Sequence, residues 1–237
     1  MNEKEKIKLN IGAGQTYIPN FINIDISEKA DISINLGEEK LPFDDDSVDF
    51  IFSYHTLEHI PDYLFALSEI YRVLKHGSQF LIGLPYVTLT EYHLVNPYHL
   101  HNFNEYSFDF FNPYPKGLKG SAAEQNTISF YKVFHRFHYI GFFKIIPPPF
   151  RSWCRRHLFN TVRQIDFGLI AIKKVELRNY QLNHKYKKDL FREFEKCLAS
   201  RRPYNNTGVI SKPKTIRGLA KIIFAGIQRV HQKWLGF

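Results

Sequence analysis

Short apolar runs, each bounded by glycine, proline or acidic residues, recur along residues 7–84. Runs of this length and composition are typical of buried parallel strands. We expect strands at residues 7–11, 22–26, 31–34, 48–53 and 79–84. Between the last two runs, apolar side chains recur at helical spacing and predict a helix over residues 61–75. A strand, a helix and a strand in this order predict a right-handed parallel crossover, and therefore an α/β fold.

The connection between the first two expected strands is short. Residues 15–21 alone separate the Gly-Ala-Gly turn from the second run, whereas a parallel crossover generally needs about a dozen residues or more. Either this crossover is compressed to about one turn, or the strand limits differ from those that the pattern indicates.

The second half of the chain is less regular. From residue 86 to residue 120 the periodicity disappears and aromatic, His, Asn and Pro residues dominate, which is typical of a functional lid. Beyond it we expect a helix over residues 129–139, a strand over 142–146, and a last strand over 165–174 that could pair with the preceding one as a hairpin. The polar and basic residues 175–205 predict one helix, and an amphipathic helix is expected over 213–237.

Composition narrows the class of protein. The 237 residues, 44% of them hydrophobic, suffice for one α/β core, so we expect a domain at residues 1–174 and a basic helical extension at residues 175–237. The N-terminus lacks the apolar run of a signal peptide, and the two cysteines form neither a disulfide framework nor a metal-ligand spacing, which favours a cytoplasmic protein. No uncharged apolar run reaches about 18 residues, the length that a membrane span needs. The net charge of +9 fits nucleic acid, anionic lipid or an anionic substrate alike.

Glycines follow the first expected strand, in the tripeptide Gly12-Ala13-Gly14. Glycines at such a turn let the backbone approach a ligand closely, although many plain turns carry them too. Asp25, at the end of the second strand, could accept hydrogen bonds from both hydroxyls of a ribose. It follows Gly14 by 11 residues, whereas dinucleotide-binding enzymes place this acid about 20 residues on, which argues against an NAD site.

A longer and more specific pattern spans residues 41–77, LPFDDDSVDFIFSYHTLEHIPDYLFALSEIYRVLKHG. Its order of L-P-F, S-x-D, L-E-H and R-V-L-K-x-G resembles the methyltransferase type 11-like family in its short-loop form, within the class I S-adenosylmethionine-dependent methyltransferases. The upstream LNIGAG and INIDI, with the compressed crossover between them, resemble it too, and the likeness covers roughly residues 7–174. The resemblance implies an enzyme with a Rossmann-like fold, a mostly parallel sheet with an antiparallel last strand, and S-adenosylmethionine as cofactor.

The same resemblance implies roles for individual residues. It assigns Gly12, Ala13 and Gly14 to the methionine and ribose parts of the cofactor, Asp25 to the ribose hydroxyls, Ile26 to the adenine face, Asn35 and Leu36 to the adenine edge, and Ser53 and His55 to the methionine or methyl end. The chain departs from the family pattern at Asn35, where an Asp is common, and after Gly14, where Gln15 and Thr16 replace the third small residue of the glycine loop.

A histidine could act as general base if the acceptor is a hydroxyl, because histidine titrates near neutral pH. The candidates are His55, His93, His99 and His101, and His55 ranks first because it follows the fourth strand at the predicted cofactor edge. A purely structural role stays open for each of them, and no metal site is expected.

The acceptor is expected to be a small molecule or a glycan that is methylated at oxygen. The four arginines at positions 151, 155, 156 and 163 either bind an anionic acceptor or form a solvated helix face, and the pattern favours the solvated face. Two other functions stay open: an interaction module in a degenerate methyltransferase fold, and methylation of nucleic acid, although the lack of a recognition motif argues against a nucleic-acid partner. The helix at 213–237 could pack on its own domain, form a homodimer contact or lie on a membrane surface.

Overall fold

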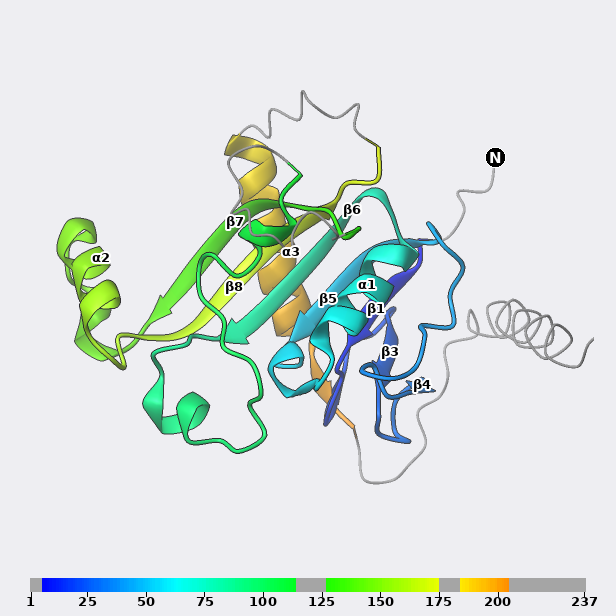
Figure 1. Ribbon diagram of the computed structural model, residues 1–237, viewed down its shortest axis with the longest axis horizontal. Coiled ribbons are helices and arrows are strands. Elements are labelled where there is room, and N and C mark those ends of the chain that lie inside the picture. Colours follow the sequence, from blue (N-terminus) through cyan, green and yellow to red (C-terminus); the bar gives the residue numbers. More distant parts are fainter. Residues whose placement is uncertain (1–5, 114–126, 175–183, 205–237) are drawn as a thin grey trace, which may run out of the picture.

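The structure, a computed structural model, describes residues 6–113, 127–174 and 184–204 (Figure 1). The strands are β1 (Lys8–Ile11), β2 (Thr16–Tyr17), β3 (Ile22–Asp25), β4 (Ile32–Ser33), β5 (Val48–Tyr54), β6 (Leu74–Pro85), β7 (Phe130–Tyr139), β8 (Val162–Ala171) and β9 (Arg202–Pro203). The α-helices are α1 (Tyr63–Val73), α2 (Pro148–His157) and α3 (His184–Ser200). Short helical turns are η1 (Leu57–His59), η2 (Thr90–Leu94), η3 (Asp109–Phe111) and η5 (Gly141–Lys144).

One sheet of seven strands forms the centre of the molecule, in the order β4-β3-β1-β5-β6-β8-β7. The strands β4, β3, β1, β5 and β6 run parallel, and β8 lies antiparallel between β6 and β7. This arrangement confirms the expected Rossmann-like α/β fold with a mostly parallel sheet and an antiparallel last strand. It also brings the carboxyl ends of β1, β3 and β5 to one edge of the sheet, where open α/β sheets bind their ligands.

Helices cover both faces of the sheet (Figure 1). Leu67 and Ile70 of α1 belong to the same core cluster as Leu9 of β1. On the opposite face, Phe194 of α3 packs in a second cluster with Phe52 of β5. The sequence of α1 explains its limits, because the Asp62 side chain accepts a hydrogen bond from the Phe65 amide at 2.9 Å and caps the first turn.

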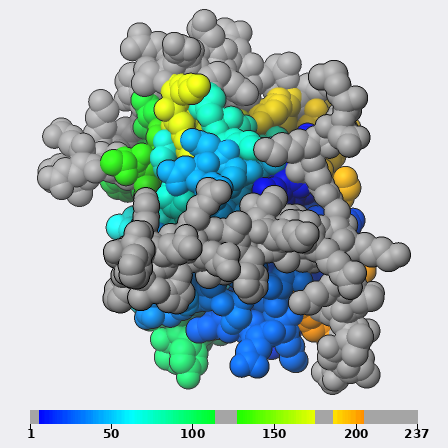
Figure 2. Space-filling model, turned by 90° about the vertical axis from the view of Figure 1, so that its right-hand side faces the viewer, coloured from blue at the N-terminus to red at the C-terminus, as the bar shows by residue number. Residues whose placement is uncertain are grey.

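The segment 184–204 is part of this fold. Besides the packing of α3, β9 pairs with β2 in an antiparallel two-stranded ladder. In the space-filling view, the blue residues of the N-terminal strands accordingly lie beside orange residues from the end of α3 and β9 (Figure 2). The expected domain boundary at residue 174 stays a prediction, and the helix expected over 213–237 lies outside the described residues.

The first crossover is compressed, as the spacing indicates. Between β1 and β3 the chain forms no helix and only the short strand β2. The five strands expected over residues 7–84, the helix before the last of them and the last strand of the sheet are all present, with limits shifted by a few residues. In the described part of the chain, no helix has the length and hydropathy that crossing a membrane requires.

Two expected elements are wrong. Residues 129–139 form strand β7 instead of a helix, and residues 142–146 form the turn η5 and its end instead of a strand. Phe130 and Phe134, four residues apart, suggest helical spacing, but an irregularity in the pairing between Lys132 and Phe134 places them in different core clusters. The hairpin-like partner of β8 is therefore β7, and the prolines that were expected to stop a strand open helix α2.

Candidate functional site

The Gly12–Gly14 turn follows β1 in a conformation that requires glycine. Gly12 and Gly14 have φ values of +71° and +60°, which L side chains rarely adopt. A Cβ on Gly12 would lie 2.0 Å from Oγ1 of Thr56, whereas a Cβ on Gly14 would meet nothing within 4 Å. The turn is held against β3 because the amides of Gly12 and Ala13 both donate to the Ile24 carbonyl, at 2.8 and 3.0 Å. Gly12 is thus fixed by packing, while Gly14 borders open space.

Asp25 ends β3 directly beside this turn. Its Oδ2 accepts a hydrogen bond from the Gly14 amide at 2.8 Å, and its Oδ1 accepts one from the Ser27 amide at 3.0 Å. Each carboxylate oxygen keeps a further lone pair, so the group can accept two hydroxyl hydrogens more. Ile26 follows with 71% of its surface exposed. An exposed apolar side chain beside a carboxylate fits a nucleoside, whose ribose is polar and whose base is flat and largely apolar.

Asn35 and Leu36 hold the next turn of the same edge. Oδ1 of Asn35 accepts from the backbone amide of Gly37 at 3.1 Å, and the backbone amide of Asn35 donates to Oε1 of Glu39 at 2.8 Å. Leu36 packs into the core. These contacts give both residues a structural role at the edge where the adenine is expected, and that assignment stays a prediction.

The end of β5 carries Ser53 and His55. Ser53 is fully buried, and its hydroxyl has no hydrogen-bond partner among the described residues. His55 follows the strand with a φ of +54°, and its backbone amide donates to the Gly83 carbonyl at 2.9 Å. Nδ1 of His55 lies 3.1 Å from Oε1 of Glu58, and Nε2 lies 3.3 Å from Oε1 of Gln164. Both partner atoms are acceptors, so the ring makes both hydrogen bonds at once only when each of its nitrogens carries a hydrogen.

A polar network that the sequence pattern did not reveal fixes Gln164. Its Oε1 accepts from the Tyr54 hydroxyl at 2.6 Å, and its Nε2 donates to Asp166, which is fully buried. Asp166 also accepts from Arg136 Nη2 at 2.6 Å and contacts His138 Nε2. Burial, followed by the charge of Asp166, raises the pKa of Tyr54, so this hydroxyl keeps its proton and donates it. The residues come from β5, β7 and β8, and only the pairing of distant strands brings them together.

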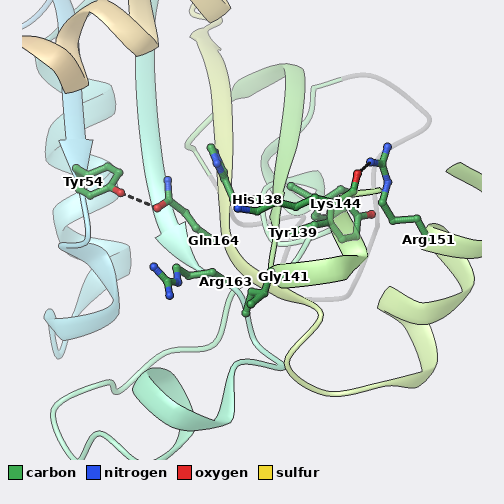
Figure 3. A pocket seen from close by; sticks show the side chains of 10 residues that line it. Tyr54, His138, Tyr139, Gly141, Lys144, Arg151, Arg163 and Gln164 are labelled. Carbon is green, nitrogen blue, oxygen red and sulfur yellow. Dashed lines mark hydrogen bonds between the residues drawn. The ribbon is translucent and has the colours of Figure 1, made fainter. Parts of the chain in front are cut away.

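A cavity of about 610 Å³ opens next to this network (Figure 3). Tyr54 and Gln164 form one wall, and the basic side chains Lys144, Arg151 and Arg163 also line it. Figure 3 shows these residues on separate segments around the space, with Tyr54 and Gln164 joined by their hydrogen bond. Three cationic side chains, with no acidic one among the described lining residues, suit an anionic ligand.

The four arginines of the expected solvated helix face have different environments. Arg151 and Arg163 line the cavity, and Arg156 is exposed. The expectation is wrong for Arg155, whose side chain is only 11% exposed and pairs with Glu105. Its guanidinium also lies 4.3 Å from the centre of the Phe137 ring, so this arginine is part of the packed structure.

Histidines gather around the short turn η1. Nδ1 of His93 lies 2.7 Å from Nδ1 of His99, and the ring of His99 stands edge-on to that of His59 at 4.6 Å between centroids. Burial lowers the pKa of His93 and of His99, which keeps both rings neutral near pH 7. His101, also a candidate base, instead has its Nε2 2.9 Å from the carbonyl of Ile60, which directly follows η1. The roles of His55, His99 and His101 stay predictions.

Comparison with known proteins agrees with the arrangement at the sheet edge. The sequence profile of a family described as methyltransferase domain matches residues 12–82, from the glycine turn to β6. This segment is that of a methyltransferase domain. It contains the glycine turn, Asp25, the end of β5 and η1, so the resemblance stated from the motifs is confirmed.

The relatives match short stretches of the chain. A demethylmenaquinone methyltransferase of Staphylococcus epidermidis is 54% identical over 38 residues, which is 16% of this chain and 16% of that protein. The sterol 4-C-methyltransferase strm-1 of Caenorhabditis elegans is 32% identical over 77 residues, covering 29% of this chain and 23% of its own length. The chain thus spans less than a quarter of the length of either of these relatives.

Solved structures with a similar arrangement include a SAM-dependent methyltransferase from Archaeoglobus fulgidus, with a TM-score of 0.47 and 15% identity over 70% of this chain and 86% of that one. The methyltransferase in complex with the Trm112 activator of Haloferax volcanii has a TM-score of 0.46 and 16% identity, over 72% of this chain and 84% of that one.

Proposed function

We propose that the protein transfers a methyl group from S-adenosylmethionine to an oxygen atom of an anionic small molecule or glycan. The observation that carries the proposal is the contact of Asp25 with the Gly14 amide at the carboxyl ends of β1 and β3, inside the segment that matches the methyltransferase domain. This contact puts a carboxylate with free lone pairs next to a backbone turn that borders open space.

The residues at this edge fit the cofactor. Asp25 would hold the ribose hydroxyls, Ile26 would cover one face of the adenine, and Gly14 would leave room for the methionine part. The buried hydroxyl of Ser53 at the end of β5 has no hydrogen-bond partner in the described part of the chain and could donate to or accept from the same ligand. When bound, S-adenosylmethionine supplies a methyl group that is already electrophilic, so the protein has mainly to align the acceptor with it.

The cavity beyond His55 is the proposed acceptor site. Lys144, Arg151 and Arg163 would bind the negative charge of the acceptor, and Tyr54 and Gln164 would border its reacting end. With its one ring hydrogen on Nδ1, facing Glu58, His55 would take the proton of the acceptor hydroxyl at Nε2 as the new O–C bond forms and the bond between the methyl group and the sulfonium sulfur breaks. The names of the two relatives, which act on demethylmenaquinone and on a sterol, support a small-molecule acceptor.

The first experiment measures S-adenosylmethionine binding by calorimetry, with NAD as the control ligand. We expect the wild-type chain to bind S-adenosylmethionine alone, and Asp25→Asn to bind it at least about 10-fold more weakly, because a carboxylate accepting two hydroxyls is replaced by a group that also donates. Asp189→Asn, on the exposed surface of α3, is the matched control and should bind normally. No binding by the wild-type chain would favour the interaction module in a degenerate fold.

A second experiment asks whether transfer occurs. The wild-type chain and Arg163→Ala are incubated with S-adenosylmethionine and a panel of sugar phosphates and uronic acids, and methylated products are detected by mass spectrometry. Product with acidic but not with neutral sugars is expected. Methylation of neutral compounds only, or of oligonucleotides, would contradict the proposed acceptor class.

A further inference from the structure

Three side chains with metal-ligating atoms meet at η1, outside the proposed cofactor and acceptor contacts. One ligand-type atom of Glu58, one of His59 and one of His99 all lie within 4.8 Å of one another. Glu58 and His59 are adjacent on η1, and His99 reaches them from the irregular segment after β6. The Leu100 amide ties the two segments together by donating to the Glu58 carbonyl at 2.7 Å.

The hydrogen-bond network fixes which ring nitrogens carry protons. Oδ1 of Asn102 can only accept, so Nε2 of His93, at 2.9 Å, donates to it and leaves Nδ1 of His93 as an acceptor. Nδ1 of His99 therefore donates to His93, and Nε2 of His99 keeps a lone pair. His59 follows the same logic, because its Nδ1 lies 3.0 Å from the Tyr98 carbonyl and must donate to it. Both histidines thus keep an unprotonated Nε2.

Glu58 supplies a carboxylate that lacks a complete set of partners. Its side chain is fully buried, and Oε1 accepts from Nδ1 of His55. Oε2 is buried and has no hydrogen-bond partner among the described residues. A buried carboxylate oxygen without a partner is costly, so such groups are generally paired or bound to a metal ion. The rings of His59 and His99 lie beside this carboxylate, and a ring nitrogen that carries no hydrogen cannot donate to it.

We infer that Glu58, His59 and His99 bind one divalent transition-metal ion, of the class of zinc or cobalt. Two imidazole nitrogens and one carboxylate oxygen are ligands that such ions prefer, and a set of three leaves a coordination position open. With bonds of about 2.0–2.1 Å, tetrahedral ligands lie about 3.3 Å apart, so the three atoms close in by small side-chain rotations. His93 and Asn102 hold His99 in the ligating tautomer, as partners of metal ligands typically do.

The place of the ion gives it a role that rests on the proposed function, while the binding itself does not. Glu58 links the ion to His55, the residue at the methyl end. An ion bound to Glu58 would fix the carboxylate that accepts from Nδ1 of His55, and would therefore hold the His55 ring in one orientation. His59 is exposed, so the site is reachable from solvent.

The test is a titration of the full chain, freed of metal by a chelator, with Zn²⁺ by calorimetry and with Co²⁺ by its visible absorption. We expect one ion per chain in the wild type. His59→Ala and His99→Ala should weaken binding at least about 10-fold, the loss that even a partner of a metal ligand causes. The matched control is His157→Ala, an exposed histidine whose Nδ1 lies 2.8 Å from the Trp153 carbonyl, as His59 does with Tyr98. It should bind like the wild type.

The results of these titrations either support or overturn the proposed metal site. Absence of a bound ion in the wild type, or equal affinity in all three variants, would overturn the metal site. S-adenosylmethionine binding is measured on the same samples without metal, so a failure of the cofactor proposal and a failure of the metal site are distinguished. Because His59 is exposed, its variant is expected to fold even if substitution of the buried Glu58 is not tolerated.

Discussion

Replacing Gly12 with alanine should destabilise the protein more than the same replacement two residues later. The new methyl group would lie 2.0 Å from Oγ1 and 2.2 Å from Cγ2 of Thr56, and 2.6 Å from its Cβ. Thr56 is buried, and its carbonyl accepts from the His59 amide at 3.0 Å, so it cannot move without disturbing η1. Overpacking of this kind costs about 1–3 kcal/mol. The positive φ of +71° at Gly12 adds about 1 kcal/mol for an L residue.

The expected loss for Gly12→Ala is therefore about 2–4 kcal/mol in the free energy of unfolding, measured by urea denaturation. Thr56→Ala in the same chain removes the two nearest clashing atoms and should recover part of the loss, which a double-mutant cycle measures. The turn would also be displaced, so the variant should bind S-adenosylmethionine poorly.

Gly14→Ala is the matched control, because its φ of +60° is similar and its Cβ meets nothing within 4 Å. It should cost about 1 kcal/mol of stability from the backbone alone. Its methyl group would nevertheless occupy the open space proposed for the cofactor, so S-adenosylmethionine affinity should fall at least about 10-fold. Equal destabilisation by the two variants, or normal cofactor affinity of Gly14→Ala, would refute this account of the turn.

Three further predictions concern buried groups. Arg155→Met should lower the free energy of unfolding, measured by urea denaturation, by about 3–5 kcal/mol, because it leaves the carboxylate of Glu105 buried without its cation. The control Arg156→Met, at an exposed position, should change the same free energy by less than about 0.5 kcal/mol. Burial opposes ionisation of Glu105, but hydrogen bonds and the Arg155 charge outweigh it and lower the pKa of this carboxyl. The stability that ionised Glu105 contributes should be complete above about pH 5 and be lost as the pH falls through the folded-state pKa. The free energy of unfolding should therefore depend less steeply on pH below about pH 4.5 in Glu105→Gln than in the wild type. Burial raises the pKa of Cys197 to about 12, so iodoacetamide should label Cys154 in the native protein and Cys197 only after unfolding, and labelling of both at equal rates would contradict the packing of α3.

The parallel half of the sheet could be predicted because each of its strands is a short apolar run with its own local boundaries. The strands expected over residues 7–11 and 22–26 end at Ile11, just before the glycine turn, and at Asp25, which is within one residue of the ends that the pattern indicates. The site residues of this half are close in sequence to the strand ends that carry them. A pattern that is read along the chain is therefore sufficient to propose such a site.

The antiparallel half could not be predicted in the same way. Phe130 and Phe134 have a spacing that suits a helix, and only the pairing of β7 with β8, with its local irregularity, decides the matter. Pro147–Pro149 likewise interrupt a strand pattern, but prolines are also compatible with the first turn of a helix, and that is where they occur in α2. In both places tertiary contacts select between two local conformations that the residues allow.

The same division separates the two parts of the proposed site, and it can be tested. Asp25 and the glycine turn come from the parallel half, whereas Lys144, Arg151 and Arg163 come from β8 and the excursion between β7 and β8. Arg163→Ala should therefore leave S-adenosylmethionine affinity within about 2-fold of the wild type, while methylation of an acidic acceptor loses the attraction of one cation. Parallel loss of cofactor affinity in calorimetry would show that the cavity belongs to the cofactor site and would refute the division, because a residue that touches only the acceptor contributes nothing to the binding of the cofactor alone.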